Sequence, residues 1–276
     1  MRVLITGAGG QIGTALVEAF ADDDVVATTR AELDLADRDS TMAAICGVTP
    51  DVVVHAGAWT AVDACEADPD LAFRVNALGT RHVANAARIV GAHVVYVSTD
   101  YVFEGTAGEP YHEWSETNPQ SVYGRSKLAG ERELDPASTI VRAAWVVGPH
   151  GRNFVKTMLR LAGEREEIGV VDDQRGCPTF TSDLAPLVRQ LAAARLPGTY
   201  HATNAGATTW FEFARAVLTA AGDDPDKVRP VTTAEYGAAA PRPANSVLDN
   251  LALRSLGWQP LPPWQDALER TIKELV

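Results

Sequence analysis

Two residues that could exchange a proton, Tyr123 and Lys127, stand four positions apart in the segment Tyr123-Gly124-Arg125-Ser126-Lys127. In a helix this spacing places both side chains on one face. The pKa of a free tyrosine is about 10, and a nearby ammonium that favours the phenolate would bring it closer to working pH. Such a pair could serve as an acid or a base, although Tyr and Lys also meet at this spacing by chance.

A hydroxyl group stands ahead of that pair, at the end of an apolar run over 94–97 that continues into Ser98-Thr99-Asp100. Doubly wound sheets bind their ligands at the carboxyl ends of their strands. The Thr99 hydroxyl could therefore hydrogen-bond a carbonyl oxygen and stabilise the negative charge that develops on it. Ser and Thr also commonly close strands or cap helices, so this pattern alone leaves both interpretations open.

A glycine-rich turn follows the first apolar run, 3–6, and spaces Gly7, Gly10 and Gly13 three apart, with Gln11 and Ile12 between the last two. Glycines at this spacing permit a tight strand-to-helix turn, a close approach of the backbone to a diphosphate, and close packing of helix on sheet. A helix N-terminus favours the negative charge of phosphates. The turn predicts a dinucleotide site, and the alternative is a tight turn without a ligand.

The second apolar run ends in Thr28-Thr29-Arg30. A Rossmann fold that prefers NAD usually carries an acidic residue roughly 20 positions after its glycine turn. A guanidinium at this place would instead attract the 2′-phosphate of NADP, which its planar fork can bind in a bidentate way. We therefore expect NADPH as the cofactor, with NADH possible. Arg30 could also be a solvated cation at a strand end.

The elements that must position these residues are short apolar runs that alternate with segments of helical period. The runs cover 3–6, 25–29, 52–56, 94–98 and 140–145, and helices are expected over 11–20, 70–90 and 121–134. Because the runs are continuous in Val, Ile and Ala instead of alternating with polar residues, they are typical of parallel strands covered on both faces. The predicted fold class is α/β, a Rossmann-type doubly wound parallel sheet.

The alternation weakens after Trp145, where helical patterns cover 153–161, 182–194, 210–221 and 264–275, and the stretch 232–243 is irregular. A possible return strand lies at 198–201. We expect residues 1–147, with roughly 177–205 returning to the sheet, to form an NAD(P)-binding domain. The remaining parts, roughly 148–176 and 206–276, are expected to form a smaller C-terminal substrate-binding lobe.

Length and composition limit the classes of function. The 276 residues suit one α/β unit with a smaller appendage, and the net charge of −12 argues against a nucleic-acid partner. Three cysteines without a CxxC pair predict neither a disulfide framework nor a zinc site. The N-terminal apolar run is too short for a signal segment and no run is long enough to span a membrane, so a cytoplasmic protein without a membrane partner is expected.

Three motifs together resemble those of the extended short-chain dehydrogenase/reductase family. They are Gly7-x-x-Gly10-x-x-Gly13, the hydroxyl residues that end the fourth apolar run, and Tyr123-x-x-x-Lys127. Further segments resemble the branch of that family that reduces dTDP-linked 4-keto-6-deoxy sugars. They span almost the whole chain and cover 10–13, 60–63, 98–103, 123–131, 173–179 and 242–246.

The resemblance implies that NAD(P)H delivers hydride to C4 of a dTDP-4-keto-6-deoxy sugar, with conversion of dTDP-4-dehydrorhamnose to dTDP-rhamnose as the expected reaction. Tyr123 would protonate the resulting alkoxide, Thr99 would assist it, and Lys127 would also hold the nicotinamide ribose. The residues implied to line the cofactor are Asp34 and Leu35 at the adenine end and Ala56, Gly57 and Ala58 after the third strand. The residues implied to reach the substrate are Thr99, Asp100, Trp145, Arg242 and Asn245.

The chain departs from the family pattern near the cofactor, where His55-Ala56-Gly57 replaces Asn-Ala-Ala and Trp59 replaces a tyrosine. These changes leave the expected chemistry intact and put the identity of the sugar in question. Some family members dimerise through a magnesium site built on glutamates, one of them early in the first helix. Here that region reads Thr14-Ala15, so no metal is predicted, and the chain is expected to be a monomer or a homodimer.

Three other functions fit parts of the pattern. The nearest is a 4-ketoreductase for another dTDP-deoxysugar, for example in dTDP-dihydrostreptose synthesis. A non-catalytic Rossmann regulatory subunit would often lack part of the catalytic set, whereas Tyr123, Lys127 and Thr99 are all present. An epimerase or dehydratase commonly carries an Asp-Glu pair after the fourth-strand Thr, and here Asp100-Tyr101 follows.

Overall fold

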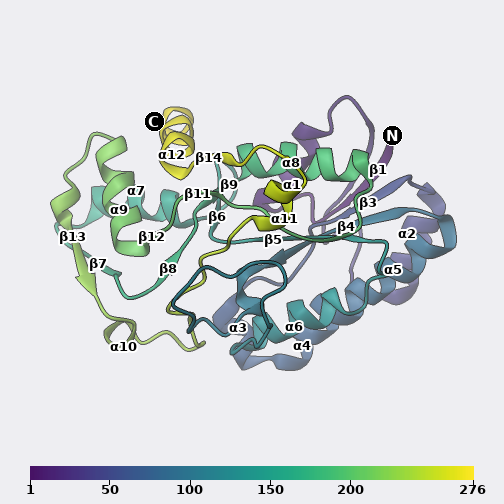
Figure 1. The fold of residues 1–276 in the computed structure, drawn as a ribbon, viewed down its shortest axis with the longest axis horizontal. Coiled ribbons are helices and arrows are strands. Elements are labelled where there is room, and N and C mark those ends of the chain that lie inside the picture. Colours follow the sequence, from purple (N-terminus) through teal and green to yellow (C-terminus); the bar gives the residue numbers. More distant parts are fainter.

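In the computed structural model, which describes residues 1–276, a six-stranded sheet lies at the centre of the molecule (Figure 1). All of its neighbouring strands pair in parallel, as predicted. In spatial order the strands are β2 (Asp24–Thr28), β1 (Arg2–Thr6), β3 (Val52–His55), β4 (His93–Thr99), β5 (Thr139–Ala143) and β10 (Gly198–His201). The last of these confirms the return strand expected at 198–201.

The direction of strand addition reverses between β1 and β3, because the chain first places β2 on one side of β1 and then crosses over to place β3 on the other. Such a reversal leaves a crevice beyond the carboxyl ends of the two strands, where doubly wound folds bind their ligands. The glycine turn at Gly7 lies at this position, directly after β1.

Helices cover both faces of the sheet, which explains why its strands are apolar throughout. In β1, Val3 and Ile5 pack into the cluster formed with α1 (Gln11–Ala19) and α8 (Thr181–Ala194), whereas Leu4 packs into the cluster on the opposite face. The helices on that opposite face are α2 (Arg38–Val48), α5 (Gly79–Val90) and α6 (Val122–Glu131) (Figure 1). The Rossmann-type doubly wound fold is thus confirmed.

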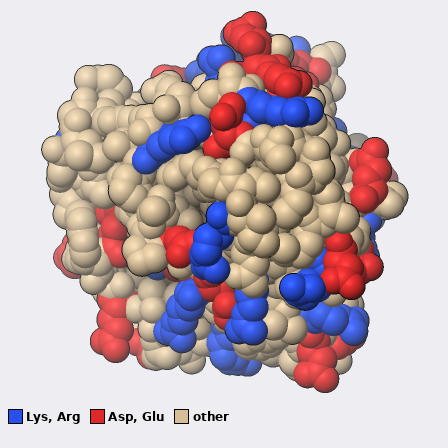
Figure 2. Space-filling model, turned by 90° about the vertical axis from the view of Figure 1, so that its right-hand side faces the viewer, with Lys and Arg blue, Asp and Glu red and all other residues tan.

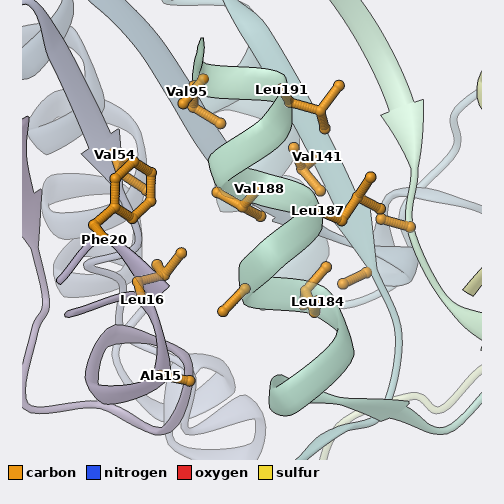
Figure 3. Close-up of a cluster of buried hydrophobic side chains, with 14 of the residues drawn as sticks. Ala15, Leu16, Phe20, Val54, Val95, Val141, Leu184, Leu187, Val188 and Leu191 are labelled. Atoms are coloured by element: carbon orange, nitrogen blue, oxygen red, sulfur yellow. The ribbon is translucent and has the colours of Figure 1, made fainter. Parts of the chain in front are cut away.

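The packing of α8 on the sheet fixes the place of α1 and of the glycine turn before it. Helix α8 contributes Leu184, Leu187, Val188 and Leu191 to the buried cluster that also contains Ala15 and Leu16 of α1 (Figure 3). Burial of a side chain of this kind stabilises the fold by about 1.5–3 kcal/mol relative to exposure. The packing of α1 against α8 and the sheet therefore holds the start of α1 in place.

A second buried cluster lies beside the sheet, at the left of Figure 1. Phe213 packs near its centre, with the Phe154 ring 5.6 Å and the Trp264 ring 5.5 Å away between centroids. The cluster joins α7 (Phe154–Glu164), α9 (Trp210–Ala220), α12 (Trp264–Leu275) and the parallel pair β7 (Ile168–Val171) and β13 (Val228–Val231). The three helices confirm the helical patterns expected at 153–161, 210–221 and 264–275.

The structure differs from the sequence predictions in several elements. The single helix expected over 70–90 is divided into α4 (Pro69–Phe73), a π-helical turn (Arg74–Leu78) and α5. The turn places the side chain of Asn76 so that its Oδ1 accepts from the backbone N–H of Trp59 at 2.7 Å. Helices α2 and α3 (Val62–Ala67) were not predicted from the sequence.

Within the stretch expected to be irregular, Thr232 and Glu235 form a capping box that starts α10 (Thr233–Tyr236). The short helix α11 (Leu251–Ser255) places Ala252 and Leu253 in the first cluster, although its residues fall within the range expected for the second lobe. The short strand pairs are β6 (Val146–Val147) with β9 (Thr179–Phe180), β8 (Arg175–Gly176) with β12 (Thr208–Thr209), and β11 (Asn204–Ala205) with β14 (Leu261–Pro263).

The surface carries both signs of charge. On the face shown in Figure 2, basic and acidic side chains lie among one another, with broad uncharged areas between them. None of the helices combines the length and the apolar character that crossing a bilayer requires.

Candidate active site

A cavity of about 780 Å³ opens at the carboxyl ends of β1, β3 and β4, where the strand order reverses. It brings together most of the residues singled out from the sequence, although they are far apart along the chain. Those that line it are Gly7, Gly10, Gln11, Ile12, Arg30, Ala56, Gly57, Ala58, Thr99, Asp100, Tyr123, Lys127 and Trp145.

Helix α6 presents Tyr123 and Lys127 to this cavity. The helix starts at its cap residue Ser121, whose Oγ accepts from the backbone N–H of Gly124 at 3.0 Å. Tyr123 is 9% exposed, and the ring of Tyr101 meets it edge-on with 5.5 Å between centroids. The Nζ of Lys127 donates a hydrogen bond to the backbone carbonyl of Val97 at 2.8 Å, so the amine is held against the end of β4.

Burial dominates the electrostatics of this pair. It raises the pKa of the Tyr123 phenol above its usual value, the nearby Asp100 carboxylate acts in the same direction, and the Thr99 hydroxyl acts against both. Burial also lowers the pKa of Lys127 to about 7, although the carboxylate of Glu131 opposes it. The prediction that the pKa of Tyr123 lies closer to working pH is therefore wrong in this structure, because burial outweighs the groups that would lower it. A raised pKa keeps the phenol protonated, as a proton donor requires.

The residues that end β4 add a hydroxyl and a carboxyl group to the cavity wall. Thr99 Oγ1 donates to Asp100 Oδ1 at 3.0 Å and accepts from the backbone N–H of Tyr101 at 3.2 Å. Asp100 is 2% exposed and its Oδ2 has no hydrogen-bond partner. Burial raises the pKa of this carboxyl group to about 6, and the nearby hydroxyl groups of Ser246 and Thr99 oppose the shift. The free oxygen could accept a hydrogen bond from a ligand hydroxyl.

The glycine turn has the shape that a diphosphate site needs. Gly7 has φ +71°, and a Cβ there would lie 2.6 Å from the Cα of Gly57. A Cβ on Gly13 would lie 2.1 Å from the Gly7 carbonyl oxygen, so Gly13 permits close packing of the turn and does not itself line the cavity. No side chain caps the start of α1 at Gly10, which leaves the first N–H groups of the helix for an anion.

A smaller hollow of about 130 Å³ adjoins the glycine turn and contains the residues expected at the adenine end, Asp34 and Leu35. Arg30 lines both this hollow and the main cavity. Arg30 is therefore shared by the adenine hollow and the main cavity, and its contact with a 2′-phosphate stays a prediction. The residues present fit a dinucleotide along its whole length.

The two residues expected to hold the sugar nucleotide lie apart from the main cavity. Arg242 pairs with Asp63 at 2.7 Å and lines a further cavity of about 300 Å³, which shares Tyr101 with the main one. The side-chain amide of Asn245 donates to the backbone carbonyl of Ala107 at 2.7 Å, so it is committed to the fold of that loop. The structure does not bring Asn245 to the cavity, and a role in binding stays a prediction.

Several lining residues were missed by the sequence analysis. Trp210 at the start of α9 stacks on Trp145 with 3.6 Å between ring centroids and 10° between planes. Trp145 has a left-handed backbone, with φ +46°. Arg152 also lines the cavity. Neither Trp210 nor Arg152 lies in a local motif. The glycine before Arg152, a residue type common in turns, is the one signal in that segment.

Comparisons with known proteins agree over the full length of the chain. The family model described as the RmlD substrate binding domain matches residues 1–276. A dTDP-4-dehydrorhamnose reductase from Streptomyces griseus is 44% identical, with 99% of this chain and 94% of the relative covered. A dTDP-4-keto-6-deoxy-D-glucose reductase from Streptomyces niveus is 41% identical, with 97% of this chain and 95% of the relative covered.

Among solved structures, a dTDP-4-dehydrorhamnose reductase from Bacillus anthracis in complex with NADP superimposes with a TM-score of 0.96. It is 42% identical in sequence, and the match covers 99% of each chain. The match to the family model over every residue, together with relatives of this similarity along nearly the whole length, shows that the chain belongs to the dTDP-4-dehydrorhamnose reductase family.

Proposed function

We propose that this chain is an NADPH-dependent reductase that acts on the C4 keto group of a dTDP-4-keto-6-deoxy sugar. The proposal rests on one observation: one cavity is lined by Tyr123, Lys127, Thr99 and the glycine turn. The names of the relatives and the NADP in the Bacillus anthracis structure support it.

NADPH, when bound, supplies the hydride. The free N–H groups at the start of α1 bind its diphosphate, Arg30 binds its 2′-phosphate, and Asp34 and Leu35 line its adenine. Ala56, Gly57 and Ala58 flank it along the end of β3. Lys127, whose amine already lies at the cavity wall, holds the nicotinamide ribose.

The chain's own residues handle the proton and the sugar. Once its hydroxyl turns away from Asp100, Thr99 donates a hydrogen bond to the keto oxygen and stabilises its developing charge. Tyr123 then donates its proton to that oxygen, and the pKa raised by burial ensures that the phenol carries the proton when the sugar arrives. Asp100 accepts a hydrogen bond from a sugar hydroxyl through its free Oδ2. The stacked rings of Trp145 and Trp210 cover an apolar part of the sugar and exclude water from it.

The expected substrate is dTDP-4-dehydrorhamnose, which would be reduced to dTDP-rhamnose. The name of the Streptomyces niveus relative favours a second candidate, the 4-keto sugar derived from glucose. We further propose that the two buried clusters correspond to a cofactor-binding domain and a substrate-binding lobe, with Arg242 at the nucleotide end of the substrate. A cytoplasmic location and a monomeric or homodimeric state stay predictions.

A panel of dTDP-4-keto sugars, each offered with NADPH and with NADH, tests the proposal. We expect stoichiometric oxidation of NADPH with at least one sugar, and the stereochemistry of the product at C4 would identify which one is natural. Turnover without net oxidation of the cofactor would indicate an epimerase or a dehydratase instead. Binding of NADPH without turnover of any sugar would indicate a regulatory subunit.

A further inference from the structure

We propose that Arg152, from a loop beside the glycine turn, binds the diphosphate of the dinucleotide. This inference rests on the proposed function, because it concerns the same cofactor. Arg152 lies in the loop 148–153, between β6 and α7, and its side chain is exposed. It lines the main cavity together with Gly9, Gly10 and Gln11 of the glycine turn.

The loop 148–153 lies directly against the start of α1. Gly151 has φ +65°, and a Cβ at this position would lie 2.9 Å from Cγ of Gln11, the first residue of that helix. One position earlier, His150 Nε2 lies 3.1 Å from the carboxylate of Glu18, also on α1. The backbone of this loop is therefore held beside the start of α1, and Arg152 follows Gly151 in it.

The ends of the loop are fixed, so Arg152 is presented from a preformed structure. The side-chain amide of Asn153 donates to the carbonyl of Gly148 at 2.7 Å, which closes the loop on itself. The Oδ1 of Asn153 accepts from the backbone N–H of Lys156 at 3.1 Å and caps α7. A Cβ on Gly148 would lie 2.1 Å from Oγ1 of Thr181, so that end packs tightly against the start of α8.

The charges around the cavity favour an anion. The chain has a net charge of −12, yet the cavity is lined by two arginines, Arg30 and Arg152, by Lys127, and by a single carboxyl group, that of Asp100. Lys127 donates to the carbonyl of Val97, and Arg30 lies toward the adenine hollow. Arg152 is the cation that remains beside the glycine turn. Its planar fork can bind two phosphate oxygens at once.

Both the cofactor and the proposed substrate contain a diphosphate. The close approach of Gly151 to Gln11 points to the cofactor, because Gln11 starts the helix whose free N–H groups would bind the dinucleotide. Binding to the cofactor should change the affinity for NADPH and NADH, whereas binding to the substrate should change the KM of the sugar nucleotide, so an experiment can separate the two.

The test compares Arg152→Ala and Arg152→Lys with Arg165→Ala, a control that removes the same charge from an exposed position after α7 and outside the cavity. NADPH, NADH and 2′-AMP, which lacks a diphosphate, are titrated against the tryptophan fluorescence of the whole chain. For Arg152→Ala we expect the Kd of NADPH and of NADH to rise by the same factor, about tenfold, as for the loss of one hydrogen bond to a charged group. The Kd of 2′-AMP should not change, and Arg152→Lys should recover part of the affinity.

Three results would overturn the inference. NADPH could bind Arg152→Ala as tightly as it binds the Arg165→Ala control. The KM of the sugar nucleotide could rise while the affinity for the cofactor stays constant, which would assign the arginine to the substrate. The affinity could also fall for NADPH and not for NADH, which would show that the arginine binds the 2′-phosphate. If the wild-type chain binds NADPH but reduces no dTDP-4-keto sugar, the proposed function fails while the titrations still decide the role of Arg152.

Discussion

Replacement of Tyr123 by phenylalanine isolates the proton donor from everything else that the residue does. The ring is buried against Cys65, Ala72 and Val122 and meets the ring of Tyr101 edge-on, and phenylalanine keeps all of these contacts. Only the hydroxyl, which the burial of the residue keeps protonated, is removed. We therefore expect Tyr123→Phe to fold normally and to bind NADPH with unchanged affinity.

The expected loss of activity follows from the size of general acid catalysis. A positioned proton donor contributes about 10²–10⁴-fold to the rate, which corresponds to about 2.7–5.4 kcal/mol of transition-state stabilisation. The kcat of Tyr123→Phe should fall by about that factor, because the alkoxide must then take its proton from water. Single-turnover measurements of NADPH oxidation at saturating sugar nucleotide report this chemical step.

The matched control is Tyr200→Phe. The Tyr200 hydroxyl donates to the carbonyl of Pro197 at 3.0 Å on the edge strand β10, outside the cavity. Its loss should lower the free energy of unfolding by about 1 kcal/mol and leave kcat unchanged. A near-normal kcat for Tyr123→Phe would refute the role of Tyr123 as donor, whereas equal losses in both variants would indicate damage to the fold.

Three further predictions address the cofactor site and the core. Arg30→Ala should weaken the binding of NADPH much more than that of NADH, and equal losses in the two titrations would remove the 2′-phosphate contact. Gly13→Ala should lower the free energy of unfolding in urea by about 1–3 kcal/mol because a Cβ there has no space, whereas Gly163→Ala, where nothing lies within 4 Å, should not lower it. Similar stabilities of the two variants would contradict the close packing of the turn. Glu131→Ala should lower the free energy of unfolding by about 3–5 kcal/mol because it leaves a buried arginine without its partner. Glu164→Ala, which breaks an exposed ion pair, should lower it by about 0–1 kcal/mol. A similarly small decrease for Glu131→Ala would show that the buried site admits water.

The sequence by itself determined the local elements and the chemistry that they carry. Continuous Val runs predicted parallel strands, and the sheet buries alternate residues of β1 and β3 on opposite faces, so each strand must be apolar throughout. The glycine turn and the spacing of Tyr123 and Lys127 were also recognisable, since both depend on backbone conformation and helix period within a few residues.

Tertiary structure alone decided which distant groups meet, and in what electrostatic surroundings. Lys127 donates its amine to the carbonyl of Val97, and burial of Tyr123 raises the pKa that the spacing of the pair had suggested would be lowered. Trp210 and Arg152 reach the cavity because α9 and the loop 148–153 pack beside the sheet, and no local pattern records that packing. Asn245, which lies in a recognisable motif, instead donates its amide to the backbone of a neighbouring loop. Periodicity and turn chemistry act over a few residues, whereas burial and charge depend on contacts between segments that only the folded chain brings together.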